Sequence, residues 1–207
     1  MLRNLISFVM CFFIYNYSVA QKSFIGIAKY KMTVIGSSDT KTDSMKIIFG
    51  VDKIKTIFYL PANDNSGKIM EKAYIDDFTT NTSIDIDQNG LTFTVSPMNL
   101  SEGYTFSNTN KFDAVISNLC LIYKADSMKF DRNKLSKVEC LASIDYGFTK
   151  VKNYFFYGVQ PIVIDNRIVL NFTTTQKDGL KPFVNLYDLK KMDDTESYFS
   201  LWGLKQK

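Results

Sequence analysis

Short runs in which apolar and polar residues alternate recur along this chain, and they constrain its fold more than any other feature. The clearest case is the pair of runs 83–87 and 91–95, which alternate on either side of Asn89-Gly90. Asn-Gly favours a tight primed turn because both positions tolerate positive φ, so the pattern predicts a β-hairpin. Its apolar face would carry Ile84, Ile86, Leu91, Phe93 and Val95. Its polar face, with Asp85, Asp87, Thr92 and Thr94, would point to water.

Similar strand-like runs lie on both sides of this hairpin. They cover residues 23–35, 43–51, 53–60, 68–78, 138–148, 150–158, 162–175, 183–189 and 198–204. Asp165-Asn166 favours a second tight turn inside the run 162–175. About ten strands with mostly short links argue against alternating βα units and predict a mainly β fold, an antiparallel sheet curled into a half-barrel, barrel or sandwich.

One segment departs from the period of two. Its apolar residues recur at helical spacing and are Phe112, Val115, Ile116, Leu119, Ile122 and Tyr123. This spacing predicts a helix over residues 111–124, with capping side chains at 108–110 and Asp113 in the first turn. The run 116–123 is also compatible with a buried strand. With the helix, the expected fold is a curled antiparallel sheet carrying one or two helices.

The N-terminal segment is typical of an exported protein. Arg3 supplies a positive charge, residues 5–14 are apolar, and Ser18-Val19-Ala20 places small residues at the positions that a signal peptidase reads. The alternative is an uncleaved anchor, but a spanning helix needs roughly 20 mostly apolar residues. We expect residues 1–20 to be removed, leaving a single β-rich domain over 21–207 in the periplasm, cell envelope or extracellular space. We expect no transmembrane segment after cleavage.

Lipidation at Cys11 is disfavoured because Met10 precedes this cysteine, where a small residue is needed. Cys120 and Cys140 remain after processing. In an oxidising compartment this even pair suggests one disulfide, and the alternative is two buried free thiols.

Charge and composition exclude several functions. The net charge is +4, and it falls to +3 when Arg3 is removed, with Lys and Asp interspersed rather than clustered. A nucleic-acid partner is therefore not expected. The chain contains no histidine, which excludes histidine-based triads, bases and metal sites.

Two acidic patterns could in principle carry chemistry. Asp85-x-Asp87-x-Asn89-Gly90 matches the first half of a calcium loop, but Phe93 and Ser96 stand at the ninth and twelfth positions, where the loop needs oxygen ligands. The hairpin explains the same residues, so no metal site is predicted.

Acidic residues also occur as the pair Asp76-Asp77 and as the cluster Asp193, Asp194 and Glu196. Adjacent strand residues point to opposite faces, so Asp76 and Asp77 cannot converge on one bond, and both sets are interpreted as solvated charges. Neither a nucleophile motif nor a glycine-rich phosphate loop is present, so no catalytic residue or cofactor is predicted. A carboxylate-only hydrolase remains an alternative if two acids lie about 5 to 9 Å apart in a cleft.

The densest aromatic stretch is 154–157, Tyr-Phe-Phe-Tyr. A strand that is aromatic on both faces packs against something on both sides. One interpretation is a core on one face and a lid, helix or partner on the other. The other is a concave apolar surface that holds a hydrophobic ligand.

Several segments together resemble a known group of exported proteins. They are the strand 26–32 (Gly-Ile-Ala-Lys-Tyr-Lys-Met), the strand 44–50 (Ser-Met-Lys-Ile-Ile-Phe-Gly), the cysteine strand 138–142, the aromatic stretch 154–157 and Pro161. The pattern is similar to the Bacteroidetes GLPGLI or DUF4412-type proteins, related in shape to the LolA and LppX lipoprotein carriers. The name-giving motif departs at its third, fourth and fifth residues, in Gly179-Leu180-Lys181-Pro182-Phe183-Val184.

This resemblance implies an unclosed half-barrel whose concave face meets apolar ligands, with helices such as 111–124 plugging the mouth. Together with the alternation, it leads to the hypothesis of a non-enzymatic exported protein that holds a lipid or another apolar ligand. Each buried methylene would contribute roughly 0.8 kcal/mol to binding. The candidate lining residues are Met45, Ile47, Phe49, Phe93, Phe155 and Tyr157. The alternative is a structural or interaction protein that docks a partner protein of the cell envelope.

Overall fold

The structure is a computed structural model, and it describes residues 22–35, 43–61, 69–87, 90–100, 104–125, 135–157, 160–176 and 181–207. The predicted signal peptide and Cys11 lie outside these ranges. Among the described residues, no helix has the length and apolar character needed to cross a membrane.

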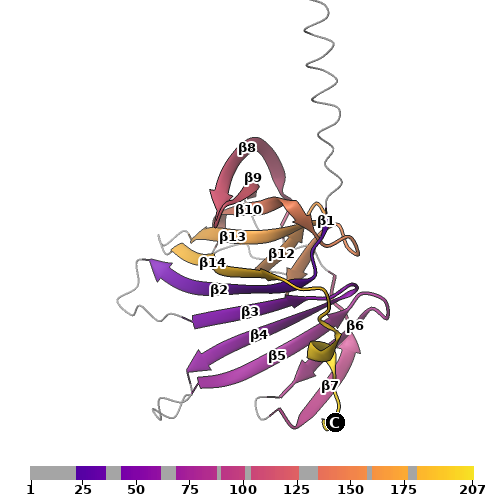
Figure 1. The fold of residues 1–207 in the computed structure, drawn as a ribbon. Coiled ribbons are helices and arrows are strands. Elements are labelled where there is room, and N and C mark those ends of the chain that lie inside the picture. Colours follow the sequence, from indigo (N-terminus) through magenta and orange to yellow (C-terminus); the bar gives the residue numbers. More distant parts are fainter. Residues whose placement is uncertain are drawn as a thin grey trace, which may run out of the picture.

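Fifteen strands pair into one sheet in the described part of the chain (Figure 1). The N-terminal strands are β1 (Lys22–Ser23), β2 (Gly26–Ile35), β3 (Asp43–Phe49), β4 (Lys53–Pro61), β5 (Ile69–Asp77), β6 (Thr82–Ile86) and β7 (Thr92–Pro97). The following strands are β8 (Ser107–Val115), β9 (Asn118–Ala125), β10 (Leu135–Gly147), β11 (Tyr154–Phe156), β12 (Gln160–Ile164), β13 (Arg167–Gln176), β14 (Lys181–Lys191) and β15 (Lys205–Gln206). A single short 3-10 helix, η1 (Glu196–Phe199), is described.

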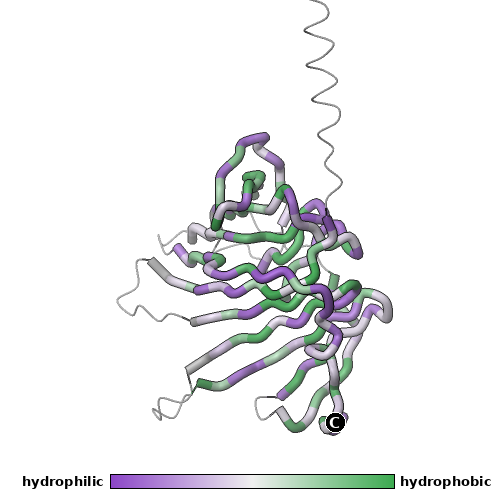
Figure 2. Tube along the Cα trace, viewed as in Figure 1, coloured by the Kyte–Doolittle hydropathy of each residue, from purple (hydrophilic) through white to green (hydrophobic). Residues whose placement is uncertain are grey.

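The sheet is curled and unclosed, and its pairs are antiparallel except for β1 with β10 and β15 with β7. Its order is β15-β7-β6-β5-β4-β3-β2-β14-β13-β10-β9-β8. The hairpin β11–β12 branches from β13 and is not part of this path. A mainly β fold with a curled antiparallel sheet is therefore confirmed. Figure 2 shows apolar and polar residues alternating along many of the strands, as the sequence indicates.

The turn predicted at Asp165-Asn166 is present, and the register confirms the hairpin predicted around Asn89-Gly90, of which Asn89 lies outside the described residues. β6 and β7 pair with Ile84 opposite Val95 and Ile86 opposite Phe93, and Gly90 has a φ of 64°. Asp165 and Asn166, with φ values of 48° and 61°, join β12 to β13. Positive φ at both central positions is the signature of a primed turn, which matches the twist of the flanking strands.

The predicted helix over 111–124 is wrong, because this segment is the hairpin β8–β9. Ile116 and Ser117 have φ values of 45° and 63° and form its turn. The residues with helical spacing do not share one face of this hairpin. Phe112 lies opposite Leu121 on one face, whereas Val115 lies opposite Asn118 on the other. The alternative interpretation, a strand over 116–123, is correct from Asn118 onward, where β9 begins.

The predicted strand 198–204 is also wrong. Tyr198, Leu201 and Leu204 recur every three residues, and they cover the outer face of the sheet instead of extending it. With the buried Phe199 they pack on side chains of β3 to β6, namely Ile48, Ile57, Ala73, Ile75 and Ile86. Lys55 Nζ donates a hydrogen bond of 2.8 Å to the Tyr198 carbonyl oxygen, which fixes this C-terminal arm.

Candidate functional site

The inner face of the sheet changes from apolar to polar between β4 and β7. One cross-strand row, read from the register, runs Ala28, Ile47, Thr56, Tyr74, Asp85, Thr94. The next row runs Phe49, Ile54, Asp76, Ser83, Ser96. Neighbouring strands are about 4.8 Å apart, so the carboxylates and hydroxyls of β5, β6 and β7 lie side by side on one surface.

Strand β11 lies inside the curl and packs on both of its faces. The Phe156 ring is 5.2 Å from that of Phe58 and 5.1 Å from that of Tyr74, and the Tyr154 ring is 5.1 Å from that of Phe78. On the opposite side, Phe155 joins a second core cluster that contains Tyr123 and Cys140 of β9 and β10. The expectation that this aromatic strand packs on both sides is confirmed, whereas the described residues contain no α-helix of the kind that the resemblance implies.

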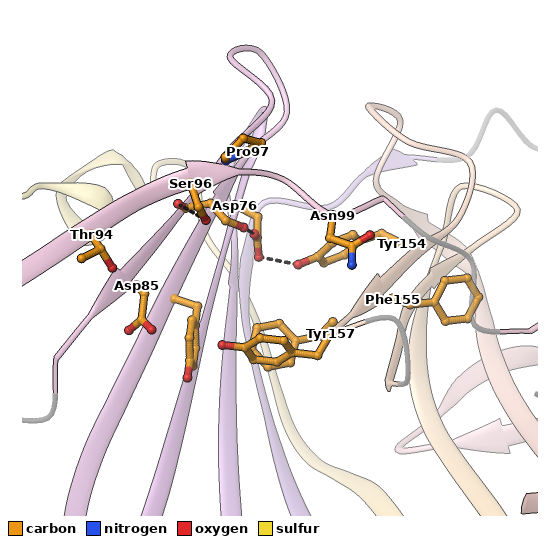
Figure 3. A pocket seen from close by; sticks show the side chains of 12 residues that line it. Asp76, Asp85, Thr94, Ser96, Pro97, Asn99, Tyr154, Phe155 and Tyr157 are labelled. Atoms are coloured by element: carbon orange, nitrogen blue, oxygen red, sulfur yellow. Dashed lines mark hydrogen bonds between the residues drawn. The ribbon is translucent and has the colours of Figure 1, made fainter. Parts of the chain in front are cut away.

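A groove lies where the polar rows meet β11 (Figure 3). It has a volume of about 210 Å³ and opens to solvent. Its polar side is formed by Asp76, Ser83, Asp85, Thr94, Ser96, Pro97 and Asn99. Its aromatic side is formed by Tyr74, Tyr154, Phe156 and Tyr157, and Phe155 also borders it although its ring packs in the second core cluster. In the described part of the chain, this groove combines an aromatic wall with acids and hydroxyls, and we refer to it as the β5–β11 groove.

Asp76 closes the inner end of this groove as a buried carboxylate, only 3% exposed. The Ser83 hydroxyl donates a hydrogen bond to its Oδ1 and the Tyr154 hydroxyl to its Oδ2. Burial raises the pKa of Asp76, and the two hydrogen bonds oppose this rise. Burial and the neighbouring Asp76 charge raise the pKa of Tyr154, so its hydroxyl stays protonated. Asp76 is thus not a solvated charge, which corrects the interpretation from sequence.

Asp77, the sequence neighbour of Asp76, points to the other face as expected. Its carboxylate lies 3.9 Å from Lys53 Nζ and accepts hydrogen bonds from the backbone N–H groups of Thr79 and Thr80. It therefore stabilises the β5–β6 turn and does not contribute to the groove.

Asp85 forms the centre of the polar side. Its carboxylate is paired with Lys72, whose ammonium also lies 5.1 Å from the centre of the Tyr74 ring. The Asp85 side chain remains 42% exposed. The protein's own lysine therefore balances this charge while one side of the carboxylate still faces the groove.

Tyr157 presents its ring to the groove from the end of β11. It is 65% exposed, although its ring packs edge to face against Phe156 at 4.5 Å and Tyr74 at 5.3 Å. In Figure 3 its hydroxyl points toward the strands that carry Asp85 and Thr94. Its φ is 50°, a conformation that costs a bulky residue of order 1 kcal/mol or more and that clusters at functional sites.

The structure brings together only two of the six residues predicted to line a ligand site. Phe155 and Tyr157 both line the β5–β11 groove. Met45, Ile47 and Phe49 lie on the inner face but are completely covered by other core side chains. Phe93 is on the outer face, against the C-terminal arm.

Sequence reasoning missed the polar half of the groove. The sequence assigned Asp85 and Thr94 to the correct strands and to the correct face of the hairpin, but that face points into the curl and not to bulk water. The signal that could have found them is the loss of apolar residues from one face of β5 to β7, combined with an aromatic strand that needs two partners.

Asp87 stabilises the β6–β7 hairpin, in agreement with the interpretation of the partial calcium motif as a hairpin. Its carboxylate accepts hydrogen bonds from the Leu91 and Thr92 backbone N–H groups at 3.1 and 3.3 Å, and from the Thr92 hydroxyl at 2.5 Å. These bonds lower its pKa to about 2. In the part of the chain that the structure describes, no three His, Cys, Asp or Glu residues are grouped to hold a metal ion.

Cys120 and Cys140 are both buried free thiols. Cys140 lies opposite Tyr123 and Cys120 lies opposite Ser143, so the two cysteines are three residues out of register and on opposite faces. Three residues of strand span about 10 Å, which exceeds the Cα separation of a disulfide, about 7 Å at most. The structure therefore matches the alternative of two buried thiols.

Comparisons with known proteins identify no family. No protein-family model and no curated protein matches the sequence. Among solved structures, the chain is similar to PNGF-II, with a TM-score of 0.52 and 13% identity over 88% of this chain. The match spans 31% of the PNGF-II chain, so this chain corresponds in length to about a third of that protein.

Weaker matches are a LolA superfamily protein from Nitrosomonas europaea and a DUF1329 family protein from Desulfovibrio piger. Their TM-scores are 0.40 and 0.31, their identities 9% and 12%, and each match covers 90% of the other chain and 87% or 86% of this one. The class that the structure itself defines is an unclosed, curled antiparallel sheet with an aromatic hairpin inside. At these identities the likeness to PNGF-II is one of fold.

Proposed function

We propose that this chain is an exported, non-enzymatic binding module whose ligand lies in the β5–β11 groove. The proposal rests on one observation. The inner face of the sheet becomes polar at the same place where β11 sets aromatic rings opposite Asp85 and Thr94. Such a groove suits an amphipathic ligand, with an apolar face against the rings and hydroxyl groups against the polar strands.

The groove is a better site for a ligand than the centre of the curl. A lipid tail beneath β2 to β4 would have to displace Tyr154 and Phe156, which already pack on that face. Core side chains are close-packed, and removing such contacts is costly. We therefore propose that the apolar part of the ligand lies against the aromatic side of the groove and its polar part against β6 and β7.

The acids of the groove are arranged for binding and stability. Asp76 and Asp85 are diagonal neighbours on β5 and β6, which places their Cβ atoms about 7 Å apart. A carboxylate-only hydrolase could use such a spacing. However, both oxygens of Asp76 accept hydrogen bonds from the protein, and Asp85 is paired with Lys72. Asp76 therefore has no oxygen free to act as a general acid or base, and Asp85 alone does not supply the pair of carboxylates that such a hydrolase requires.

Export rests on the N-terminal sequence, in which Ala20 precedes the proposed cleavage point. N-terminal sequencing of the protein recovered from the exported fraction is expected to begin at Gln21. A first residue at Met1 in that fraction would contradict cleavage without touching the proposal for the groove.

The binding proposal is tested by nuclear magnetic resonance on the labelled, processed protein. Octyl β-glucoside, below its micelle concentration, serves as a probe with both an apolar part and hydroxyl groups. We expect shifted amide signals on β6, β7 and at Tyr157, and a weaker effect in Tyr157→Ala. Tyr187→Ala is the matched control, because Tyr187 is an exposed tyrosine on β14, away from the groove. Shifts elsewhere only, or equal effects in both variants, would contradict the proposal.

A further inference from the structure

Building on the proposed function, we propose that the ligand of the β5–β11 groove is a saccharide, with one sugar ring stacked on Tyr157 and its hydroxyl groups bonded by Asp85, Thr94 and Ser96. Three features of the groove support a saccharide as the class of ligand that its two sides recognise together.

The first feature is the aromatic platform. The Tyr157 ring is held on two sides by Phe156 and Tyr74, which leaves its exposed face fixed in orientation. Its left-handed backbone conformation is unfavourable for tyrosine and yet directs this ring into the groove. A rigid, half-exposed tyrosine offers a large contact area at a small cost in conformational entropy. The flat face of a sugar ring, lined by C–H groups, fits such a platform.

The second feature is the supply of acceptors on β6 and β7. The Asp85 carboxylate and the hydroxyls of Thr94 and Ser96 stand on adjacent strands facing Tyr157. An acyl chain brings no donor to these groups, and covering them without hydrogen bonds costs about 1–3 kcal/mol for each group. Sugar hydroxyls both donate and accept, so they satisfy a carboxylate and neighbouring hydroxyls at once.

The third feature is the position of Lys72, which favours a neutral saccharide over a cationic ligand. An ammonium group would be attracted by Asp85 and by the Tyr74 ring. Lys72 already occupies both positions, being paired with Asp85 and lying 5.1 Å from the Tyr74 ring centre. A cationic ligand would have to displace the protein's own lysine, whereas a neutral polyhydroxylated ring can use the exposed part of Asp85.

The size of the groove agrees with one sugar ring. Its volume of about 210 Å³ is below the roughly 300–1,000 Å³ of pockets that bury a drug-sized molecule. The groove is open to solvent, so an oligosaccharide could place one ring inside while the rest of the chain continues outside.

The experiment is a screen of the processed protein on an array of neutral oligosaccharides, followed by calorimetric titration of the best binder. We expect at least one saccharide to bind, and Tyr157→Ala to weaken it about tenfold or more, as the loss of one stacking platform predicts. Asp85→Asn and Thr94→Val are expected to weaken binding several-fold. Tyr187→Ala and Asp188→Asn are the matched controls, since Asp188 is an exposed acid paired with Lys29 on other strands.

Sodium octanoate provides the second arm of the test. If no saccharide binds but octanoate shifts the amide signals of the groove, the saccharide assignment is overturned and the proposed binding site stands. If neither probe nor octyl β-glucoside affects the groove, both proposals fail. Circular dichroism of every variant at the titration temperature shows whether a loss of binding reflects unfolding.

Discussion

The Tyr154 hydroxyl of β11 donates a hydrogen bond to the buried carboxylate of Asp76 on β5, which joins two residues 78 positions apart in the chain. This bond connects the inner hairpin to the main sheet at the closed end of the β5–β11 groove. It also provides half of the hydrogen bonding that Asp76 receives from the protein, since Ser83 provides the other half.

Tyr154→Phe removes one donor from a buried carboxylate. We expect it to lower the free energy of unfolding by about 1–3 kcal/mol at pH 7, because a buried charged acceptor loses a partner. Near pH 4 the loss is expected to be smaller, since protonated Asp76 depends less on the donor. Denaturant unfolding at the two pH values measures both quantities.

Tyr30→Phe is the control for this change. The Tyr30 hydroxyl donates to the Val169 carbonyl oxygen at 2.8 Å, and this acceptor carries no titrating charge. Its cost should be about 0.5–1.5 kcal/mol at both pH values. An equal dependence on pH in the two variants would show that Asp76 is not the group responsible.

Asp76→Asn tests the raised pKa of Asp76. A carboxyl whose pKa is higher in the folded state than in the unfolded state binds more protons when folded, so stability falls as pH rises through that window. Relative to Asp76→Asn, we therefore expect the wild type to lose stability as pH rises from 3.8, the ordinary pKa of an aspartate, to the raised pKa of Asp76 in the folded protein. A wild type that gains stability over this interval would mean that hydrogen bonding outweighs burial.

Asp87→Asn should show the opposite sign. The pKa of Asp87 is lowered from 3.8 to about 2, so its contribution is present above pH 4 and is lost as pH falls toward 2. The difference in stability between wild type and Asp87→Asn is expected to vanish in that interval. Thermal unfolding measured from pH 2 to pH 6 provides the curve, and a difference that stays constant would argue against a charged carboxylate at the hairpin turn.

The state of the cysteines can be measured directly. Burial raises the pKa of Cys120 to about 11 and that of Cys140 well above its usual range, so both thiols should react slowly with Ellman's reagent in the folded protein. Unfolding in guanidinium should release both. An intact mass lower by two hydrogen atoms would instead reveal the disulfide that the register excludes.

Gly50→Ala tests the contact between the sheet and the C-terminal arm. A methyl group at this position would lie 2.8 Å from Cε2 of Phe199. We expect a loss of about 1–3 kcal/mol from overpacking. In the double variant with Phe199→Leu, the loss should be smaller than the sum of the two single changes, because the shorter side chain leaves room for the methyl group. Additive losses would show that the arm does not rest on Gly50.

Local patterns in the sequence predicted most of the strands, the β6–β7 hairpin and the turn at Asp165-Asn166, because alternation and turn residues act over a few positions. The hairpin around Gly90 is the best example, since its register follows from the turn. The segment 111–124 could not be resolved in this way. Its apolar residues satisfy a helical period, and only tertiary packing of Val115 and Tyr123 on different clusters selects the hairpin.

The candidate site could not be predicted in the same way, because it is formed by strands that are far apart in the sequence. Phe155 and Tyr157 were predicted as lining residues from alternation, but nothing local indicates that β11 lies inside the sheet opposite Asp85. Met45 and Phe49 were correctly placed on one face, yet alternation does not distinguish a ligand groove from a packed core. Asp76 appeared solvated because its two donors, Ser83 and Tyr154, come from other strands.

The central claim is that a ligand occupies the β5–β11 groove and not the interior of the curled sheet. Intermolecular nuclear Overhauser effects between octyl β-glucoside and the protein test it most directly. We predict effects from the sugar-ring protons to the Tyr157 and Tyr74 rings and to the Thr94 methyl group. Effects confined to the side chains of Met45 and Ile47 beneath β2 to β4 would contradict the claim.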